Sequence, residues 1–183
     1  MRRYIFTGAP GAGKTTLLGA LSALGYPVVP EAATDVVAIQ QAKGIAQPWT
    51  EVQFLTDILQ LQIARQAQEA SAPVVLFDRS PICTLALARY LGHSVPSELT
   101  AEIERLVAHQ IYERDVFLVR PLGFIEPTAA RRITYEDALA FEVVHESAYR
   151  GLGFDLVEVP PVPNPARVAA VQYAIGMRDP QRT

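Results

Sequence analysis

The chain has 183 residues, of which 50% are hydrophobic and 19% are charged, and its formal net charge is −3. This length fits one domain with a substantial core, and the composition excludes a disordered chain. The small negative charge argues against a general nucleic-acid binder, so small molecules or proteins are the expected partners.

A single cysteine, Cys83, excludes an intramolecular disulfide and a cysteine metal cluster. The first residues lead straight into an apolar run without a secretory signal pattern. No apolar stretch approaches the roughly 20 residues of a membrane span. We therefore expect a soluble, cytoplasmic protein.

Apolar runs alternate with helical patterns along the chain, and glycines such as Gly25 and Gly92 follow the helical ones. The continuous apolar run 74–77 is typical of a parallel strand buried on both faces. The expected strands are Arg3–Thr7, Tyr26–Val29, Val74–Phe77, Val116–Val119 and Leu156–Val159. The expected helices are Lys14–Leu24, Ala32–Lys43, a long helix to Ala70, Ser80–Leu91, Ser97–Tyr112, Thr134–Arg150 and Asn164–Gly176.

This alternation predicts an α/β fold in one domain that spans residues 1–183, with a five-stranded parallel sheet and helices on both faces. Ligands of such sheets bind at the carboxyl ends of the strands. Local signals mark three helix starts. Thr50 with Gln53 forms a capping-box pattern, Thr134 with Asp137 opens a helix, and Asn164 precedes a proline at the first helical position.

Residues 8–15 read Gly-Ala-Pro-Gly-Ala-Gly-Lys-Thr, between the first strand and the first helix. This is the P-loop pattern, in which glycines turn backbone N–H groups toward a phosphate. Lys14 would reach the β- and γ-phosphates, and Thr15 would ligate Mg²⁺. The alternative is a glycine-rich turn that binds nothing, but a turn has no need of the Lys-Thr pair. The expected contacts of ATP, or GTP, are Gly8, Ala9, Pro10, Gly11, Ala12, Gly13, Lys14, Thr15 and Thr16.

Asp78 and Arg79 follow the third strand directly. A carboxylate at a strand end near a P-loop is the Walker B arrangement, so Asp78 is expected to hold Mg²⁺ with Thr15. Arg79 is expected to clamp a phosphate or the transferring phosphoryl group. The structural alternatives are a helix cap for Asp78 and a surface ion pair for Arg79.

Glu31 follows the second strand, so the topology places it across the cleft from the γ-phosphate. There a substrate hydroxyl needs a base to accept its proton. A helix-dipole glutamate is the structural alternative.

A connection of residues 120–134 separates the fourth strand from the next helix and contains Arg120, Arg131 and Arg132. Connections of this length are typically functional or mobile. The segment is interpreted as a lid that brings arginine to the triphosphate, with a solvated charged loop as the alternative. Arg131 and Arg132 are the catalytic candidates, and their substitution is expected to lower turnover more than nucleotide binding.

The remaining polar residues carry weaker signals. His93, His109 and His145 lack metal-ligand spacing, so surface or hydrogen-bonded structural roles are expected. Cys83 is expected to be a packing residue. The proline-rich segment 160–164 offers either a platform for a nucleotide base or only a stiff connection.

Several of these blocks together resemble the small single-domain AAA-type ATP-binding proteins: the P-loop, residues 28–33, Phe77-Asp78-Arg79, the segment before Thr134, and residues 149–160. That group includes the nicotinamide riboside kinase domain of the bifunctional bacterial NAD-biosynthesis regulator and a eukaryotic GTP-binding trafficking protein. The resemblance extends over residues 3–172 and implies a three-layer P-loop NTPase sandwich. The layout is also similar to deoxynucleoside and nucleoside monophosphate kinases, which implies a base at Glu31 and an acidic-arginine pair at Asp78-Arg79.

Two functions are consistent with these residues. The first is a small-molecule kinase that uses ATP and Mg²⁺ to phosphorylate a hydroxyl of a nucleoside-like acceptor. The second is a nucleotide-dependent ATPase or GTPase switch that acts on a protein partner. A Ras-like GTPase is disfavoured, because no Asn-Lys-x-Asp motif occurs and the two lysines are Lys14 and Lys43.

Overall fold

The structure is a computed structural model of the chain, and it describes residues 1–67, 72–123 and 134–177. Its centre is a five-stranded sheet in the order β2-β3-β1-β4-β5, in which all neighbouring strands are parallel. The strands are β1 (Arg2–Thr7), β2 (Val28–Val29), β3 (Val74–Asp78), β4 (Asp115–Val119) and β5 (Asp155–Val159). The α/β fold with five parallel strands is therefore confirmed.

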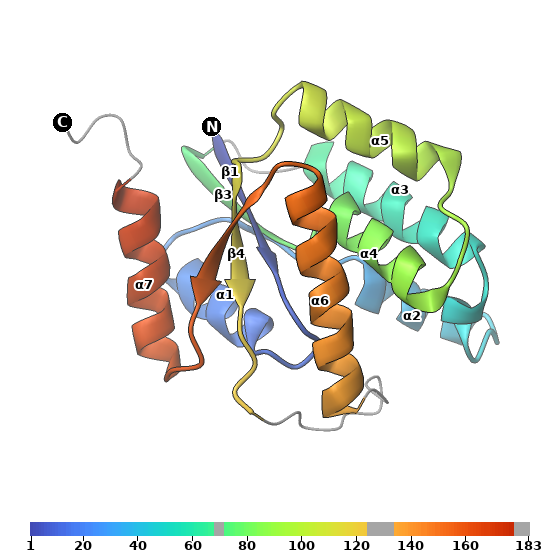
Figure 1. Cartoon of the computed structure of the whole chain (residues 1–183), viewed down its shortest axis with the longest axis horizontal. Coiled ribbons are helices and arrows are strands. Elements are labelled where there is room, and N and C mark those ends of the chain that lie inside the picture. Colours follow the sequence, from blue (N-terminus) through green and yellow to red (C-terminus); the bar gives the residue numbers. More distant parts are fainter. Residues whose placement is uncertain (68–71, 124–133, 178–183) are drawn as a thin grey trace.

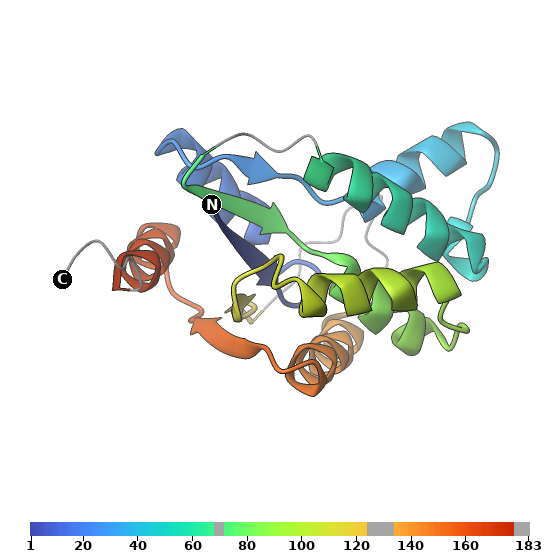
Figure 2. The same ribbon diagram turned by 90° about the horizontal axis from the view of Figure 1, so that it is seen from above.

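Helices cover both faces of the sheet (Figure 1). The described helices are α1 (Lys14–Ala23), α2 (Ala33–Ala42), the 3₁₀ turn η1 (Pro48–Thr50), α3 (Gln53–Ala67), α4 (Pro81–Leu91), α5 (Ser97–Ala108), α6 (Tyr135–Gly151) and α7 (Asn164–Met177). Figure 2 shows α3, α4 and α5 on one side of the sheet and α7 on the other.

Alternation along the strands produces two cores. On β1, Ile5 packs with the core that α3 to α6 cover, whereas Tyr4 and Phe6 pack with α1 and α7 on the opposite face. Tyr4 and Phe6 both contact the ring of Phe117 on β4, at centroid distances of 5.5 and 4.8 Å. The central strands are therefore apolar on both faces, as their continuous hydrophobic runs predicted.

Two local predictions were wrong. The capping box at Thr50 does not form, because Pro48 begins a 3₁₀ turn in which Thr50 Oγ1 donates to Gln47 O, and α3 starts later, at Gln53. The helix expected to reach Tyr112 ends at Ala108. Gln110 there has a φ of 49°, and Tyr112 instead packs edge-on against Phe77 of β3.

The helix start predicted at Thr134 is confirmed, whereas α7 begins at Asn164 itself, one residue before the predicted first helical position. Thr134 caps α6, where its Oγ1 accepts a hydrogen bond from the Asp137 N–H at 3.1 Å. Ser80 caps α4 and accepts from the Ile82 N–H at 3.2 Å. The cap is thus Ser80, and not Asp78, which ends β3.

Candidate functional site

The loop between β1 and α1 has glycines in backbone conformations that other residues rarely adopt. Gly8, Gly11 and Gly13 have φ angles of 127°, 82° and 88°. A Cβ atom at Gly8 would lie 2.4 Å from the Val119 carbonyl oxygen, so the close approach of β4 also requires glycine there. α1 begins at Lys14, which brings its N–H groups and positive dipole end to the loop. These conformations meet the requirements of a phosphate-binding loop.

Lys14 is buried, and its ammonium group folds back onto this loop. Nζ donates to Gly8 O at 3.1 Å and to Ala9 O at 2.9 Å. Burial, followed by the Arg79 guanidinium, lowers the pKa of Lys14 to about 8, while the Asp78 carboxylate opposes the shift. Lys14 is therefore mostly charged at neutral pH but loses its proton in mildly alkaline solution.

Arg167 of α7 holds the loop from the side of the protein interior. Its guanidinium is fully buried and donates to three carbonyl oxygens: Ala12 O at 2.7 Å, Arg120 O at 2.7 Å and Pro160 O at 3.0 Å. These carbonyls belong to the P-loop and to the ends of β4 and β5, so one side chain ties three loops together. Burial lowers the pKa of Arg167. Sequence analysis missed this residue, because nothing in the α7 pattern distinguishes it from a surface arginine.

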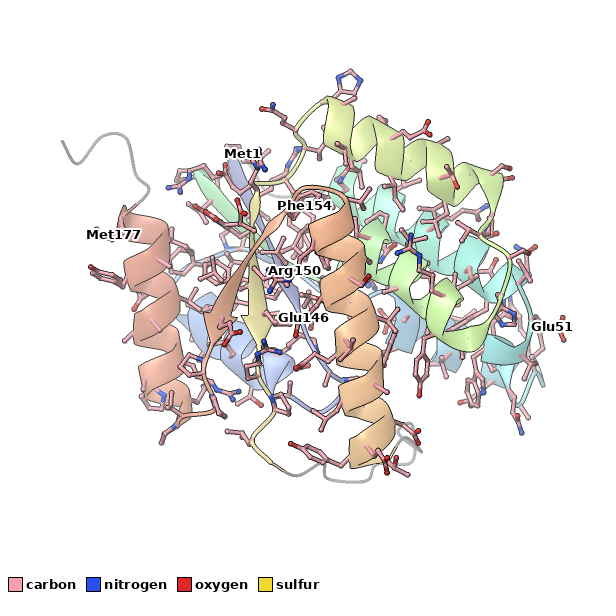
Figure 3. The ribbon with its side chains drawn as sticks, in the orientation of Figure 1. Met1, Glu51, Glu146, Arg150, Phe154 and Met177 are labelled. Carbon is pink, nitrogen blue, oxygen red and sulfur yellow. The ribbon has the colours of Figure 1, made fainter. Side chains whose placement is uncertain are left out.

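Glu142 of α6 contacts the loop from the other side. Its Oε2 accepts the Ala9 N–H at 3.1 Å, and its Oε1 accepts from Arg120 Nη1 at 2.7 Å. Arg120 also pairs with Glu146 and Glu158, both at 2.6 Å. Figure 3 shows Glu146 on the side of α6 that faces β4. Arg120 is thus held by three carboxylates, which corrects its expected role as a lid arginine directed at the triphosphate.

Glu31 lies just beyond β2 and is half-buried beside the P-loop. Its Oε1 is 2.6 Å from Arg79 Nε, and its Oε2 accepts from Thr34 Oγ1 at 3.1 Å. Burial raises the pKa of Glu31, but the Arg79 guanidinium and the Lys14 ammonium lower it by more, so it lies below its usual value. The side chain is therefore a carboxylate at neutral pH.

Arg79 connects Glu31 with the P-loop. Its backbone has a φ of 73°, which is unusual for a residue with a side chain. Nη1 lies 3.0 Å from His145 Nε2, and Nη2 donates to Gly8 O at 3.4 Å. Burial lowers the pKa of Arg79, but the Glu31 carboxylate and other neighbours raise it above its usual value. The ion pair of Arg79 with Glu31 is therefore largely buried, unlike the surface ion pair that was the structural alternative for Arg79.

A cavity of about 850 Å³ joins these residues to an apolar region. Its polar part is lined by Pro10, Gly11, Gly13, Lys14 and Thr15 of the P-loop, and by Thr16, Glu31 and Arg79. Its other part is lined mainly by apolar and aromatic side chains from α2, η1, α3, α4 and α6: Val37, Trp49, Phe54, Ile58, Leu87, Tyr90, Leu91 and Phe141. The same cavity therefore gives access to the P-loop and to a surface suited to a flat apolar group.

Comparison with known proteins identifies the family of this chain. A family model described as an AAA domain matches residues 3–167, which is most of the chain. The chain belongs to this AAA domain family. No curated protein matches it significantly by sequence.

Solved structures share the fold of this AAA domain at low sequence identity. A deoxyadenosine kinase from M. mycoides with bound dCTP is 16% identical over 97% of the chain and 100% of the kinase, with a TM-score of 0.64. The same kinase with bound dATP is 13% identical over 95% and 99%, with a TM-score of 0.56. The NadR protein in complex with NAD and AMP-PNP is 18% identical over the whole chain, with a TM-score of 0.66. The AAA domain spans about half (51%) of the NadR chain. These matches establish the three-layer fold of P-loop kinases.

Asp78 has a position apart from the cavity. It ends β3 beside Phe6 of β1 and is 8% exposed. It lines a small recess with Arg79 and Pro30, and it is not among the residues that line the large cavity. Within the described ranges, no group of three or more His, Cys, Asp or Glu side chains could hold a metal ion. Its predicted role as a Mg²⁺ ligand therefore depends on the P-loop and on nucleotide phosphates.

The other predicted site residues have varied outcomes. Arg131 and Arg132 lie outside the described residues, as does most of the predicted lid. His93 Nε2 lies 2.8 Å from Trp49 O and His109 is exposed, as expected of structural or surface histidines. His145 also has hydrogen-bond partners, but one of them is Arg79. Cys83 is buried in the core, as predicted, and it also lines the cavity. Across the described ranges, none of the helices is both long and apolar enough for a membrane span.

Proposed function

We propose that this AAA domain is a small-molecule kinase that transfers the γ-phosphoryl group of ATP to a hydroxyl of a nucleoside-like acceptor. The observation that carries the proposal is the Glu31–Arg79 pair. Both residues line the same cavity as the P-loop, and this cavity also has an apolar region. A loop that only hydrolysed ATP would need no such acceptor-sized space.

At the nucleotide end, the P-loop N–H groups and the Lys14 ammonium would hold the β- and γ-phosphates. The Thr15 hydroxyl and the Asp78 carboxylate are oxygen donors of the kind that Mg²⁺ accepts beside phosphates. When bound, the ion would neutralise charge that develops on the phosphate oxygens. Arg131 and Arg132 of the predicted lid would add positive charge.

At the acceptor end, the Glu31 carboxylate would orient the attacking hydroxyl and accept its proton. The hydroxyl oxygen forms a bond to the γ-phosphorus while the bond from that phosphorus to the β–γ bridging oxygen breaks, which releases ADP. Arg79 would stabilise charge on the transferring group, since its planar guanidinium has more donors than its contacts with Glu31, His145 and Gly8 use.

The apolar end supports an acceptor with a ring. Trp49, Tyr90 and Phe141 provide aromatic faces, and Tyr90 and Phe141 stack on each other at 4.6 Å. The names of the similar structures point the same way, since one is a deoxyadenosine kinase and NadR was solved with NR as well as with NAD. A nucleoside or nicotinamide riboside is therefore the first choice of acceptor.

The test is an incubation of the purified protein with Mg²⁺, ATP or GTP, and a panel of nucleosides, nucleotides and nicotinamide riboside. Mass spectrometry should find an acceptor that is heavier by one phosphate. Glu31→Gln should lower kcat by about 10²- to 10⁴-fold, the usual effect of losing a general base, and leave the Kd of ATP within about twofold. Glu51→Gln is a matched control, because Glu51 is exposed and lies at the far edge of the molecule (Figure 3).

The same assay separates the kinase from a nucleotide-dependent switch. A kinase consumes ATP when the correct acceptor is present. If no acceptor in the panel is phosphorylated, and a protein partner is retained by the ATP-loaded but not by the ADP-loaded protein, the switch is correct and the kinase proposal fails. If Glu31→Gln leaves turnover intact, Glu31 is not the base, but the kinase proposal itself stands.

A further inference from the structure

His145 is a fully buried histidine on α6 that lies next to Arg79. Its Nδ1 lies 2.9 Å from Phe141 O, one turn earlier in the same helix, and its Nε2 lies 3.0 Å from Arg79 Nη1. The ring also packs against the Phe141 side chain, with centroids 4.2 Å apart. The imidazole is therefore held on two edges and one face.

These partners determine which nitrogen carries the proton. A carbonyl oxygen only accepts, so Nδ1 must carry the hydrogen that bonds to Phe141 O. Nε2 then has its lone pair directed at Arg79, whose Nη1–H donates to it. A second proton on Nε2 would remove that acceptor and place two positive groups in contact. Burial lowers the pKa of His145 well below its usual value, and the charges of Arg79 and Lys14 lower it further.

The contact matters because Arg79 is held by groups from three separate elements. Glu31 from the end of β2 contacts Nε, Gly8 O from the P-loop contacts Nη2, and His145 from α6 contacts Nη1. A guanidinium is planar, so contacts at its three nitrogens together fix its position and its rotation. Without the contact at Nη1, the group could turn about the remaining contacts and Glu31 would lose its fixed partner.

We propose that His145 is a positioning residue of the transfer site, whose neutral imidazole holds the Arg79 guanidinium in the orientation that serves both Glu31 and the transferring phosphoryl group. The catalytic part of this inference rests on the proposed kinase function. His145 itself touches neither reactant. Its loss should therefore lower kcat and leave ATP binding nearly unchanged.

Two variants separate the loss of the acceptor from the loss of packing. His145→Leu fills the space without a hydrogen-bond acceptor, whereas His145→Gln places Oε1 where Nε2 lies and can still accept from Arg79. We expect His145→Leu to lower kcat at least tenfold with the Kd of ATP within twofold, and His145→Gln to stay within threefold of the wild-type kcat. Equal losses in the two variants, or equal losses of kcat and ATP affinity, would overturn the proposal. If His145→Leu does not fold, His145→Met takes its place.

A second measurement does not depend on activity. The Arg79 Nε–H resonance, assigned by its disappearance in Arg79→Lys, reports the guanidinium directly in ¹⁵N NMR spectra. Its hydrogen exchange should be at least tenfold faster in His145→Leu than in the wild type, and close to wild type in His145→Gln. If the wild type phosphorylates no acceptor but the resonance behaves in this way, the kinase proposal fails and the positioning role stands. If transfer occurs and the resonance is unchanged in His145→Leu, the positioning role fails and the kinase stands.

Discussion

The two ends of the cavity are built in different ways. The end formed by the P-loop is one continuous segment, residues 8–15. Buried side chains of α6 and α7, Glu142 and Arg167, hold its backbone through hydrogen bonds. The apolar end is assembled from residues of five separate elements that share no motif. We infer that the first end is rigid and specific for phosphates, and that the second can change from one relative to another without disturbing the first. The predictions below test this division.

The largest effect on nucleotide binding is expected at Lys14. Lys14→Met should raise the Kd of ATP about 100-fold at pH 7, because an ammonium contributes roughly 1.5–3 kcal/mol through each charge-assisted hydrogen bond to phosphate. Isothermal titration calorimetry measures this loss. The affinity of the wild type should also fall as pH rises above about 8, where Lys14 loses its proton. A pH-independent affinity between pH 7 and 9 would show that Lys14 does not carry the binding charge.

Lys14 should also govern stability in alkaline solution. Its folded pKa of about 8 is below its usual value of 10.5, so between these values the unfolded chain binds more protons than the folded one. The free energy of unfolding therefore rises with pH, by about 2 kcal/mol from pH 7 to 9.5 at 1.36 kcal/mol per unit over the titrating range. Urea denaturation at several pH values measures it.

The matched variant is Lys14→Met, which should lack this rise and be at least as stable as the wild type at pH 7. Both carbonyls that Lys14 contacts keep another donor, because Gly8 O accepts from Arg79 and Ala9 O accepts from the Ala12 N–H. A variant that is less stable than the wild type at pH 7 would contradict the expected desolvation cost of Lys14.

The substitution Glu142→Gln should destabilise the P-loop. Both of its oxygens accept from donors, Ala9 N and Arg120 Nη1, so the NH₂ group of Glu142→Gln must face one of them. We expect a loss of about 2 kcal/mol in unfolding free energy, since the site is buried and charged, together with weaker ATP binding. Glu158→Gln is the matched control. It removes an exposed partner of the same arginine and should cost about 0.5 kcal/mol or less. Equal effects of the two substitutions would show that Glu142 does not support the loop.

The same division explains how much the sequence could predict. The P-loop, the strands and the carboxylates at strand ends depend on local patterns, so residues such as Lys14, Glu31 and Arg79 were found at one cavity as expected. Glu142, His145 and Arg167 were missed or judged structural, because each lies on a helix and the P-loop residue or Arg79 that it contacts is between 66 and 155 residues away. Only the packing of α6 and α7 onto the loop reveals their contacts. Arg120 was misjudged for the same reason, since its three carboxylates come from α6 and β5.

The last test concerns the acceptor end alone. Leu87 of α4 is half-buried and lines the apolar part of the cavity, so Leu87→Trp should occupy acceptor space without reaching the P-loop. We expect the KM of the acceptor to rise about tenfold, which corresponds to about 1.4 kcal/mol, with the Kd of ATP unchanged. Leu87→Met, which nearly conserves volume, is the control and should leave both constants close to wild type. If Leu87→Trp weakens ATP binding as much as acceptor binding, the two ends are not independent. The apolar region would then form part of the nucleotide site, with the base of ATP and not the acceptor as its occupant.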